Sequence, residues 1–472
     1  MVFSDTVFVF AFLPIALAIS VVFRSTRLYA TILFILSITF YFWSSGNFVF
    51  LLLFSITANF IFGLLIVSKY NKFWLVSGVI VNVLIITYFK YTYFIASNLS
   101  FAFSSSTLEG LKNIMLPVGI SFYTFQAISY LFDISAGKIE PERRFFTYAA
   151  YISLFPQLIA GPIVRYVDVI ADLNQPRALS ENFAVGAQRF THGLFKKVLI
   201  ADSVAIIADA AFSAPISEVN FATAFIGAVA YSLQIYFDFS AYFDMAIGIG
   251  LMLGLKFNEN FRRPYSAVNL TDFWRRWHIS LSTWFRDYVY IPLGGNRSGV
   301  YALYRNLLVV FILTGLWHGA AWTYLIWGLF HGAVLIFERV ILRDRVNCEG
   351  SLNWHLFYFL PLLMFGWIIF RSESLLQMQT FIISLCSPFS IGAFTIPDVL
   401  RAGLRPFEIS IMIASSLIFI LPGQKGLGQT IVDARKGVFA ETVLLVYFLI
   451  ALFVSLTLVL SSNFSPFLYF QF

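Results

Sequence analysis

The sequence predicts an all-α, polytopic integral membrane protein. Of its 472 residues, 59% are hydrophobic, 19% are aromatic and only 12% are charged. This is too little polar surface to cover a soluble globule of that size. Apolar runs of about 18 residues or more, the length that crosses about 30 Å of hydrocarbon, recur along nearly the whole chain. Such runs indicate helices, because a transmembrane barrel is built from short alternating strands.

The first third of the chain contains six expected spans, near residues 6–23, 30–44, 48–67, 74–96, 114–134 and 145–163. The first run follows Asp5 rather than basic residues, and no small-x-small cleavage pattern follows the run before Arg24. We therefore expect a retained span and not a signal peptide.

The loops between these spans alternate in charge. Basic residues follow the first, third and fifth spans, namely Arg24, Arg27, Lys69, Lys72, Lys138, Arg143 and Arg144. The loop after the second span has no charged residue, and the loop after the fourth has only Glu109 and Lys112. The positive-inside rule then places the N-terminus outside the cytoplasm, in a protein of the inner membrane.

Further apolar runs lie near residues 191–212, 222–254, 303–337, 356–370, 376–394, 407–421 and 440–462. The 303–337 run would extend about 50 Å as one straight helix, so we expect a break at one of its glycines, Gly315, Gly319, Gly328 or Gly332. The total is about 11 to 13 membrane segments, some of them re-entrant. The polar connections are too short for a soluble domain. Residues 1–472 are thus predicted to form one membrane-embedded domain, with a motif-bearing core near 114–340 and C-terminal helices near 356–472.

Several function classes lose their usual support. The net charge of +7 is spread over short loops, which suits anionic lipid headgroups better than nucleic acid. Cys348 and Cys386 form no CxxC pair, and we expect neither a disulfide framework nor a catalytic thiol. The sequence contains no P-loop, no GxSxG elbow, no HExxH and no Cys/His cluster with zinc spacing, so no metal site is expected.

The segment 272–290 concentrates cationic, aromatic and imidazole side chains. Thr271 is the expected N-cap, with Asp272 in the first turn. Helical spacing then places one set of residues on a single face, namely Trp274, His278, Leu281, Phe285 and Tyr288. This pattern predicts an amphipathic interfacial helix. It could serve only as a lipid anchor in which His278 is incidental, or it could present His278 to a reaction.

Two of the five histidines, His318 and His331, lie in a run without charge between Arg305 and Glu338. Histidine in such a setting either moves protons or is a core residue hydrogen-bonded to a backbone carbonyl or a tyrosine. On one regular helix the two would be about 20 Å and roughly 140° apart. They are therefore not expected to share a site, and only one is expected to be the reacting base.

Two acids, Asp238 and Asp244, lie within an apolar stretch. Gln234 and Asp238 share a helix face, while Asp244 points elsewhere. The cost of burying them predicts a polar cavity or a partner from a set of arginines, Arg262, Arg263, Arg275 and Arg276. Two stretches interrupted by glycine and proline, 117–126 and 159–165, are expected to line a cavity or to be buried in protein.

Seven motifs occur in a fixed order, at residues 117–126 (PVGISFYTFQ), 158–162 (LIAGP), 236–240 (YFDFS), 260–265 (NFRRPY), 273–284 (FWRRWHISLSTW), 293–297 (LGGNR) and 316–320 (LWHGA), the last followed by 327–332 (WGLFHG). Together they resemble the membrane-bound O-acyltransferase family, and within it the bacterial alginate O-acetyltransferase branch. The resemblance covers about residues 1–375, whereas the last hundred residues match only in being hydrophobic.

This resemblance implies a helical bundle around a polar tunnel, with an acyl donor entering from the cytoplasm and the acceptor from the other side. The family's catalytic histidine matches His331, its second polar position matches His278, and His318 of the WHG motif is a supporting candidate. The implied reaction is acetyl transfer from acetyl-CoA, with no permanently bound cofactor. His331 would act as general base and His278 would orient it or stabilise an oxyanion. From charge placement, we expect CoA phosphates to be held at the cytoplasmic mouth by Arg262, Arg263, Arg275 and Arg276.

The resemblance leaves the acceptor open. Alginate is the default, and related proteins acylate cellulose, peptidoglycan, other surface glycans or, with D-alanine, teichoic acids. Expected partners are a periplasmic acetyltransferase or acyl-acceptor protein, the polysaccharide export machinery and membrane lipids, but not nucleic acid. A sugar or lipid transporter is the rival interpretation, yet the paired repeats with broken helices that many transporters show are not found. A membrane scaffold would leave the histidines without a role.

Overall fold

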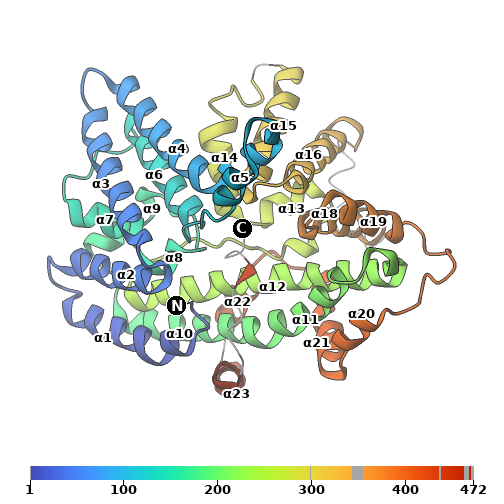
Figure 1. Ribbon diagram of the computed structural model, residues 1–472. Helices are drawn as coiled ribbons and strands as arrows, with labels where there is room; N and C mark the ends of the chain where they lie inside the picture. Colours follow the sequence, from blue (N-terminus) through green and yellow to red (C-terminus); the bar gives the residue numbers. More distant parts are fainter. Residues whose placement is uncertain (1, 298, 343–354, 435–436, 462–466, 469–472) are drawn as a thin grey trace. The chain divides into compact units, whose positions relative to one another are not determined.

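The computed structural model describes residues 2–297, 299–342, 355–434, 437–461 and 467–468. Within these residues all regular secondary structure is helical, as predicted (Figure 1). The described chain forms two compact units. Unit 1 contains residues 1–191 and 242–258, and unit 2 contains residues 192–241 and 259–468. The prediction of a single domain is not tested by this division and stays a prediction.

Unit 1 consists mainly of helices from the first third of the chain. They are a π-helical turn (Phe8–Phe12) leading into α1 (Leu13–Phe23), then α2 (Tyr29–Ser45), α3 (Phe48–Ile66), α4 (Asn71–Asn98), α5 (Ser105–Lys112), α6 (Ile120–Ser135), α7 (Phe145–Ser153), α8 (Phe155–Leu158), α9 (Tyr166–Asn174) and most of α10 (Leu179–Phe195). The first predicted span matches the π-helical turn together with α1, and the next three match α2 to α4 within a few residues.

The next two predicted spans are corrected. The helix expected over 114–134 begins only at Ile120, and the span expected over 145–163 is two short helices followed by irregular backbone. The reason is a close approach between the two interrupted stretches. Gly119 has a φ of 76°, and a Cβ there would overlap the carbonyl oxygen of Leu158. The broken backbone around Ile159 is buried in protein, as expected for irregular structure at membrane depth.

Unit 2 begins within one continuous helical segment that runs through α10, a π-helical turn (Lys196–Ala201) and α11 (Asp202–Phe212). The long helix α12 (Phe221–Leu253) follows and contributes to both units. The remaining helices are α13 (Leu270–Arg276), α14 (Ile279–Phe285), a π-turn (Arg286–Tyr290), α15 (Val300–His318), α16 (Trp322–Phe337), a π-turn (Glu338–Leu342), a π-turn (His355–Phe359), α18 (Leu360–Arg371), α19 (Leu375–Leu385), α20 (Asp398–Gly403), α21 (Pro406–Ser416), α22 (Leu427–Asp433) and α23 (Val438–Ser461). The run predicted over 376–394 is therefore helical only in α19.

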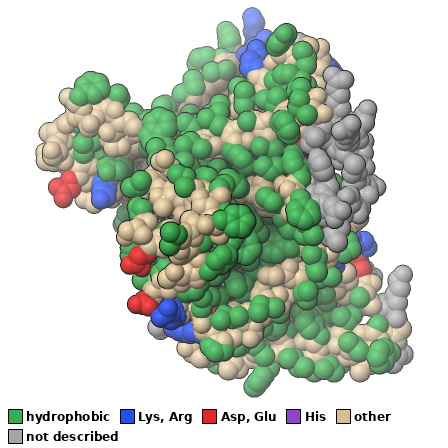
Figure 2. All heavy atoms as spheres, turned by 90° about the vertical axis from the view of Figure 1, so that its right-hand side faces the viewer, with side chains coloured by type: hydrophobic (Ala, Val, Ile, Leu, Met, Phe, Trp, Pro, Cys, Tyr) green, Lys and Arg blue, Asp and Glu red, His purple; other side chains and the backbone are tan. Residues whose placement is uncertain are grey.

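Six helices of the described chain are long and apolar enough to cross a membrane, and five shorter apolar helices accompany them. This agrees with a polytopic membrane protein containing incomplete or re-entrant segments. Figure 2 shows hydrophobic side chains spread over the face that it presents, with acidic and basic side chains in a few small groups. Large apolar side chains such as Phe50 (67% exposed) and Phe453 (73%) suit contact with lipid rather than water.

The long apolar run over 303–337 is a helical hairpin. The backbone of Gly319 is extended (φ −169°, ψ 158°), and α15 ends there before α16 begins at Trp322. Two further glycines let the helices pack closely, because a Cβ on Gly315 would overlap the carbonyl oxygen of Tyr324 and one on Gly328 that of Phe311. The predicted break is thus confirmed, and it occurs at Gly319.

Candidate active site

The hairpin brings His318 and His331 to one aromatic side chain. The indole of Trp327 lies 5.0 Å from the His318 ring and 4.6 Å from the His331 ring, measured between ring centroids. His318 is 4% exposed and His331 is 2% exposed. The expectation that these histidines cannot share a site assumed one regular helix. It is wrong because the chain reverses direction between them.

His331 is held by a hydrogen bond from α13. The indole Nε1 of Trp274 donates to Nδ1 of His331 at 3.3 Å, with the two rings nearly perpendicular at 85°. An indole N–H is only a donor, so Nδ1 must be the acceptor, and the proton of a neutral ring then lies on Nε2.

The other ring nitrogen of His331 lies beside a glycine of α18. Nε2 is buried and makes no hydrogen bond within the described part of the chain. Its neighbour on α18 is Gly366, where a Cβ would lie 3.1 Å from Nε2. The missing side chain keeps room beside a polar atom that otherwise has no partner to compensate its burial. This arrangement suits a nitrogen that meets a substrate.

His278 occupies a strained turn and not the interior of a helix. Its backbone is left-handed (φ 44°, ψ 54°), and it separates α13 from α14. The segment around Asn260 supports this turn, since the carbonyl oxygen of Asn260 accepts from the backbone N–H of Ile279 (3.0 Å) and its Oδ1 from that of Ser280 (2.7 Å). Such strain in a non-glycine residue persists only where surrounding structure imposes it, often at functional sites. The single helix predicted over 272–290 is therefore wrong.

The predicted face of that segment is nevertheless buried. Trp274, His278, Leu281, Phe285 and Tyr288 are each 9% exposed or less. The N-cap is Asn269 rather than Thr271, with its side chain accepting from the backbone N–H of Asp272. Because the aromatic side chains contact protein, the lipid-anchor interpretation fails for this face.

His278 joins the same aromatic cluster. Its ring lies 5.9 Å from Trp317, which in turn lies 4.9 Å from His318. The Nδ2 amide of Asn260 lies 3.3 Å from Nδ1 of His278. Burial lowers the pKa of His278 from 6.5 to about 3, so this imidazole is neutral at physiological pH. The three predicted histidines thus form one cluster, linked through tryptophans.

The four predicted arginines differ in exposure and in hydrogen-bond partners. Arg262 and Arg275 are exposed. Arg263 donates to the carbonyl oxygen of Pro422 (2.6 Å), and Arg276 bonds to Asp272 (2.8 Å) and to the carbonyl oxygen of Gly423 (2.9 Å). Arg263 and Arg276 therefore help to hold the loop before α22, whereas Arg262 and Arg275 are exposed and make no such bond within the described part of the chain.

The prediction that these arginines pair with the buried acids Asp238 and Asp244 is also wrong. Asp238 pairs with Lys197 at 2.7 Å, and Asp244 pairs with Arg189 at 2.5 Å. Both cations lie on the continuous helical segment 179–212. Within the described chain these acids serve structural ion pairs of the kind that burial demands.

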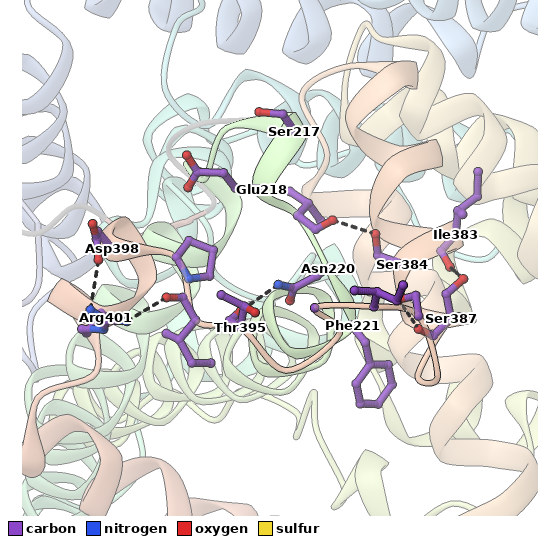
Figure 3. Close-up of a pocket in the computed structure, with 16 residues that line it drawn as sticks. Ser217, Glu218, Asn220, Phe221, Ile383, Ser384, Ser387, Thr395, Asp398 and Arg401 are labelled. Carbon is purple, nitrogen blue, oxygen red and sulfur yellow. Dashed lines mark hydrogen bonds and ion pairs between the residues drawn. The ribbon is translucent and has the colours of Figure 1, made fainter.

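A separate cavity of about 720 Å³ lies between the start of α12 and the loop after α19 (Figure 3). It is rich in hydroxyl groups, but several of these bond locally. Ser384 donates to the carbonyl oxygen of Val219 (3.1 Å) and Asn220 to that of Thr395 (2.7 Å). None of the predicted site residues lines this cavity.

Glu338 is a residue of the site region that sequence reasoning missed. It is fully buried, and its carboxylate accepts from the backbone N–H groups of Leu270 and Thr271, both at 2.8 Å. The available signal was its position as the first charge after a long apolar run. No group of three or more potential metal ligands occurs among the described residues.

Comparisons with known proteins agree with these motifs. A family model described as the membrane-bound O-acyltransferase family matches residues 62–346. The chain is 39% identical to a probable alginate O-acetylase of Azotobacter vinelandii, with both chains covered in full. It is 38% identical to a peptidoglycan O-acetyltransferase of Helicobacter pylori, over 79% of this chain and 78% of the relative. A teichoic acid D-alanyltransferase of Bacillus subtilis is 30% identical over 47% of this chain and 59% of its own length.

Proposed function

The chain belongs to the membrane-bound O-acyltransferase family and is an O-acyltransferase. From that premise we propose that it transfers acetyl groups from cytoplasmic acetyl-CoA across the inner membrane. The acetyl groups are used for O-acetylation of a secreted polysaccharide, namely alginate. The acceptor is proposed from a relative named as a probable alginate O-acetylase, which aligns over the full length of both chains. The observation that carries the reaction is the buried Nε2 of His331, which makes no hydrogen bond in the described chain and lies beside Gly366.

His331 is the proposed general base. As the acceptor's hydroxyl oxygen bonds to the thioester carbon, its proton passes to the imidazole, the C–S bond breaks, and the CoA thiolate takes up a proton. The hydrogen bond from Trp274 puts the ring proton on Nε2 at rest. Nε2–H can then polarise the thioester carbonyl. For Nε2 to accept a proton, the Trp274 bond must open and the ring proton must move to Nδ1.

His278 and His318 are proposed as supporting groups. His278 remains neutral because burial lowers its pKa to about 3, so it can donate a hydrogen bond to a developing oxyanion. His318 shares Trp327 with His331 and so helps to fix the position of that indole. Neither needs a metal or a permanently bound cofactor.

The donor's phosphates are proposed to bind the exposed pair Arg262 and Arg275, because Arg263 and Arg276 already bond to loop carbonyls. Free guanidinium groups match phosphate geometry. Reversal of charge at Arg262 and Arg275 should raise the apparent KM for acetyl-CoA, whereas reversal at Arg401, which pairs with Asp398 elsewhere in unit 2, should not. An unchanged KM in the first variant would discard this binding site.

We also propose an N-terminus outside the cytoplasm and a periplasmic partner that completes transfer to the sugar. The orientation is supported by the alternation of basic loops. Delivery through a partner would make this chain a relay, without activity on the polymer by itself.

The experiment that tests the function is complementation of a deletion strain. Wild type, His331→Ala and His192→Ala are compared at matched membrane abundance, and the acetyl ester content of the secreted polymer is measured. His192 is a suitable control because its Nδ1 bonds to the Tyr447 hydroxyl (2.6 Å) outside the histidine cluster. Loss of esters from secreted polymer in His331→Ala alone is expected.

Other outcomes would redirect the proposal. Normal acetylation in His331→Ala would remove this residue from the mechanism. Loss of the polymer itself would indicate export. Unchanged alginate esters in the deletion strain, together with loss of acyl groups from peptidoglycan, cellulose or teichoic acid, would reassign the acceptor.

A further inference from the structure

Glu338 follows α16 directly, seven residues after His331. Seven residues make about two helical turns, which places the two side chains near one face. That face contacts α13 at both positions, since Glu338 bonds to the first residues of α13 and His331 bonds to Trp274. A single short helix therefore links the proposed base to a buried carboxylate.

The carboxylate of Glu338 is saturated by hydrogen bonds. Oε1 accepts from the backbone N–H of Leu270 (2.8 Å) and from the hydroxyl of Tyr358 (3.1 Å). Oε2 accepts from the backbone N–H (2.8 Å) and the hydroxyl (2.6 Å) of Thr271. A carboxylate has about four acceptor positions, and four donors occupy them here. Three of the four fix the first turn of α13.

The same helix delivers Trp274 to His331. Trp274 lies one turn beyond Leu270 and is 9% exposed, so a shift of the first turn would move its indole within a packed environment. Its Nε1 makes the bond that assigns the proton of His331. At 3.3 Å this bond is near the long limit for N–H···N geometry, so a small displacement would break it.

We propose that Glu338 is a positioning residue for acyl transfer, which acts through α13 and Trp274 to set which nitrogen of His331 carries the proton. This inference rests on the proposed function of His331. The alternative is a purely structural role, in which Glu338 only caps the buried end of a helix.

Three variants of the full chain separate these roles in inside-out membrane vesicles of the complemented deletion strain, which retain the proposed periplasmic partner and acceptor, with release of CoA thiol from acetyl-CoA as the readout. Glu338→Gln keeps the shape but offers one acceptor atom where the carboxylate offers two. Trp274→Phe keeps a ring but removes the N–H donor. Each change weakens the Trp274 bond, which keeps the proton on Nε2, so the Nε2–H group that polarises the thioester carbonyl is lost from part of the population. Each should therefore lower kcat about tenfold or more and leave KM for acetyl-CoA within about twofold. The double variant should be no slower than the slower single variant, because both changes interrupt one route.

A matched control removes a similar cap elsewhere. Glu142 in unit 1 is buried and accepts from the backbone N–H groups of Arg143 (3.0 Å) and Arg144 (2.9 Å). Glu142→Gln should lower the melting temperature but not kcat. If Glu338→Gln also changes only the melting temperature, or if its effect on kcat multiplies with that of Trp274→Phe, the inference is overturned.

A fallback keeps the test decisive if Glu338→Gln does not accumulate. Thr271→Val removes only the hydroxyl bond at 2.6 Å and retains both backbone bonds. Its smaller loss of kcat should likewise disappear in the Trp274→Phe background, and additive losses would overturn the inference. Wild-type protein that releases no thiol would instead overturn the proposed function and this inference with it, which distinguishes the two failures.

Discussion

His331 and His278 each have a hydrogen-bond donor against Nδ1. For His331 the donor is the Trp274 indole, and for His278 it is the Asn260 amide, whose orientation is fixed because its Oδ1 accepts from Ser280. A histidine oriented as a base usually donates from Nδ1 to an acceptor and leaves Nε2 free to receive a proton. Here the reverse holds, so both rings at rest are set to donate from Nε2. Proton acceptance by His331 thus requires a rearrangement around Trp274.

Burial of His278 predicts a pH-dependent stability. The pKa is lowered from 6.5 in the unfolded chain to about 3 in the folded protein. Between these values the unfolded chain binds a proton that the folded chain does not, so stability is fully present above about pH 6.5 and falls as the pH drops toward 3. Melting in nanodiscs should show this slope in wild type and a shallower one in His278→Asn, because asparagine tolerates the left-handed backbone. Equal pH dependence of the melting temperature in the two proteins would refute the lowered pKa of His278.

The residues of the site were only partly predictable. Family motifs pointed to His331, His278 and His318, and the structure brings all three together through tryptophans. Sequence reasoning could not find Glu338 as the partner of α13, because that contact depends on how α16 and α13 meet in space. It also predicted the wrong partners for Asp238 and Asp244. A buried carboxylate needs an opposite charge, which any nearby arginine could supply, and only the fold shows that Lys197 and Arg189 are the partners.

At the scale of elements, a helix boundary could be predicted from the sequence when nearby residues cause the break in the backbone, but not when contacts with distant residues cause it. The spans matching α2 and α3 follow from apolar length alone, because each is an uninterrupted helix. The break at Gly319 was expected from length and glycine content. The break at His278 was not, because the Asn260 segment imposes it through hydrogen bonds to the residues that follow. Distant backbone partners of that kind leave no periodic signal in the sequence.

The packing of α18 against α16 yields a second prediction. Gly366→Ala would place a Cβ 3.1 Å from Nε2 of His331, so the ring must move by a few tenths of an ångström. Alanine is favoured over glycine inside a helix by about 1 kcal/mol, so folding should be kept while kcat for thiol release falls about tenfold.

Gly110→Ala on α5 is the matched control for this change, because a Cβ at that position meets no atom within 4 Å. It should keep both kcat and folding. If Gly366→Ala retains full activity, the space beside Nε2 is not needed for the reaction.

At the scale of the whole molecule, charge and hydrophobicity have separate roles. Exposed apolar side chains on the described helices suit lipid contact, whereas buried charges are compensated by an opposite charge, as for Lys197 with Asp238, or by hydrogen-bond donors, as for Glu338. Basic residues in alternate loops predict the direction of insertion. Composition therefore predicted a helical membrane protein, but it carried no information on the division into two compact units, which depends on long-range contacts.

The direction of insertion gives the last prediction. An N-terminus outside the cytoplasm puts the loop after α3 inside and α5 outside. Ser68 and Gly110 are exposed reporters for these two places in unit 1. With Cys348 and Cys386 replaced by serine, Gly110→Cys should react with a membrane-impermeant maleimide added to spheroplasts, and Ser68→Cys should react only after permeabilisation. The reverse pattern would place the basic loops near Arg24 and Lys69 outside the cytoplasm and would refute the proposed orientation of the N-terminus.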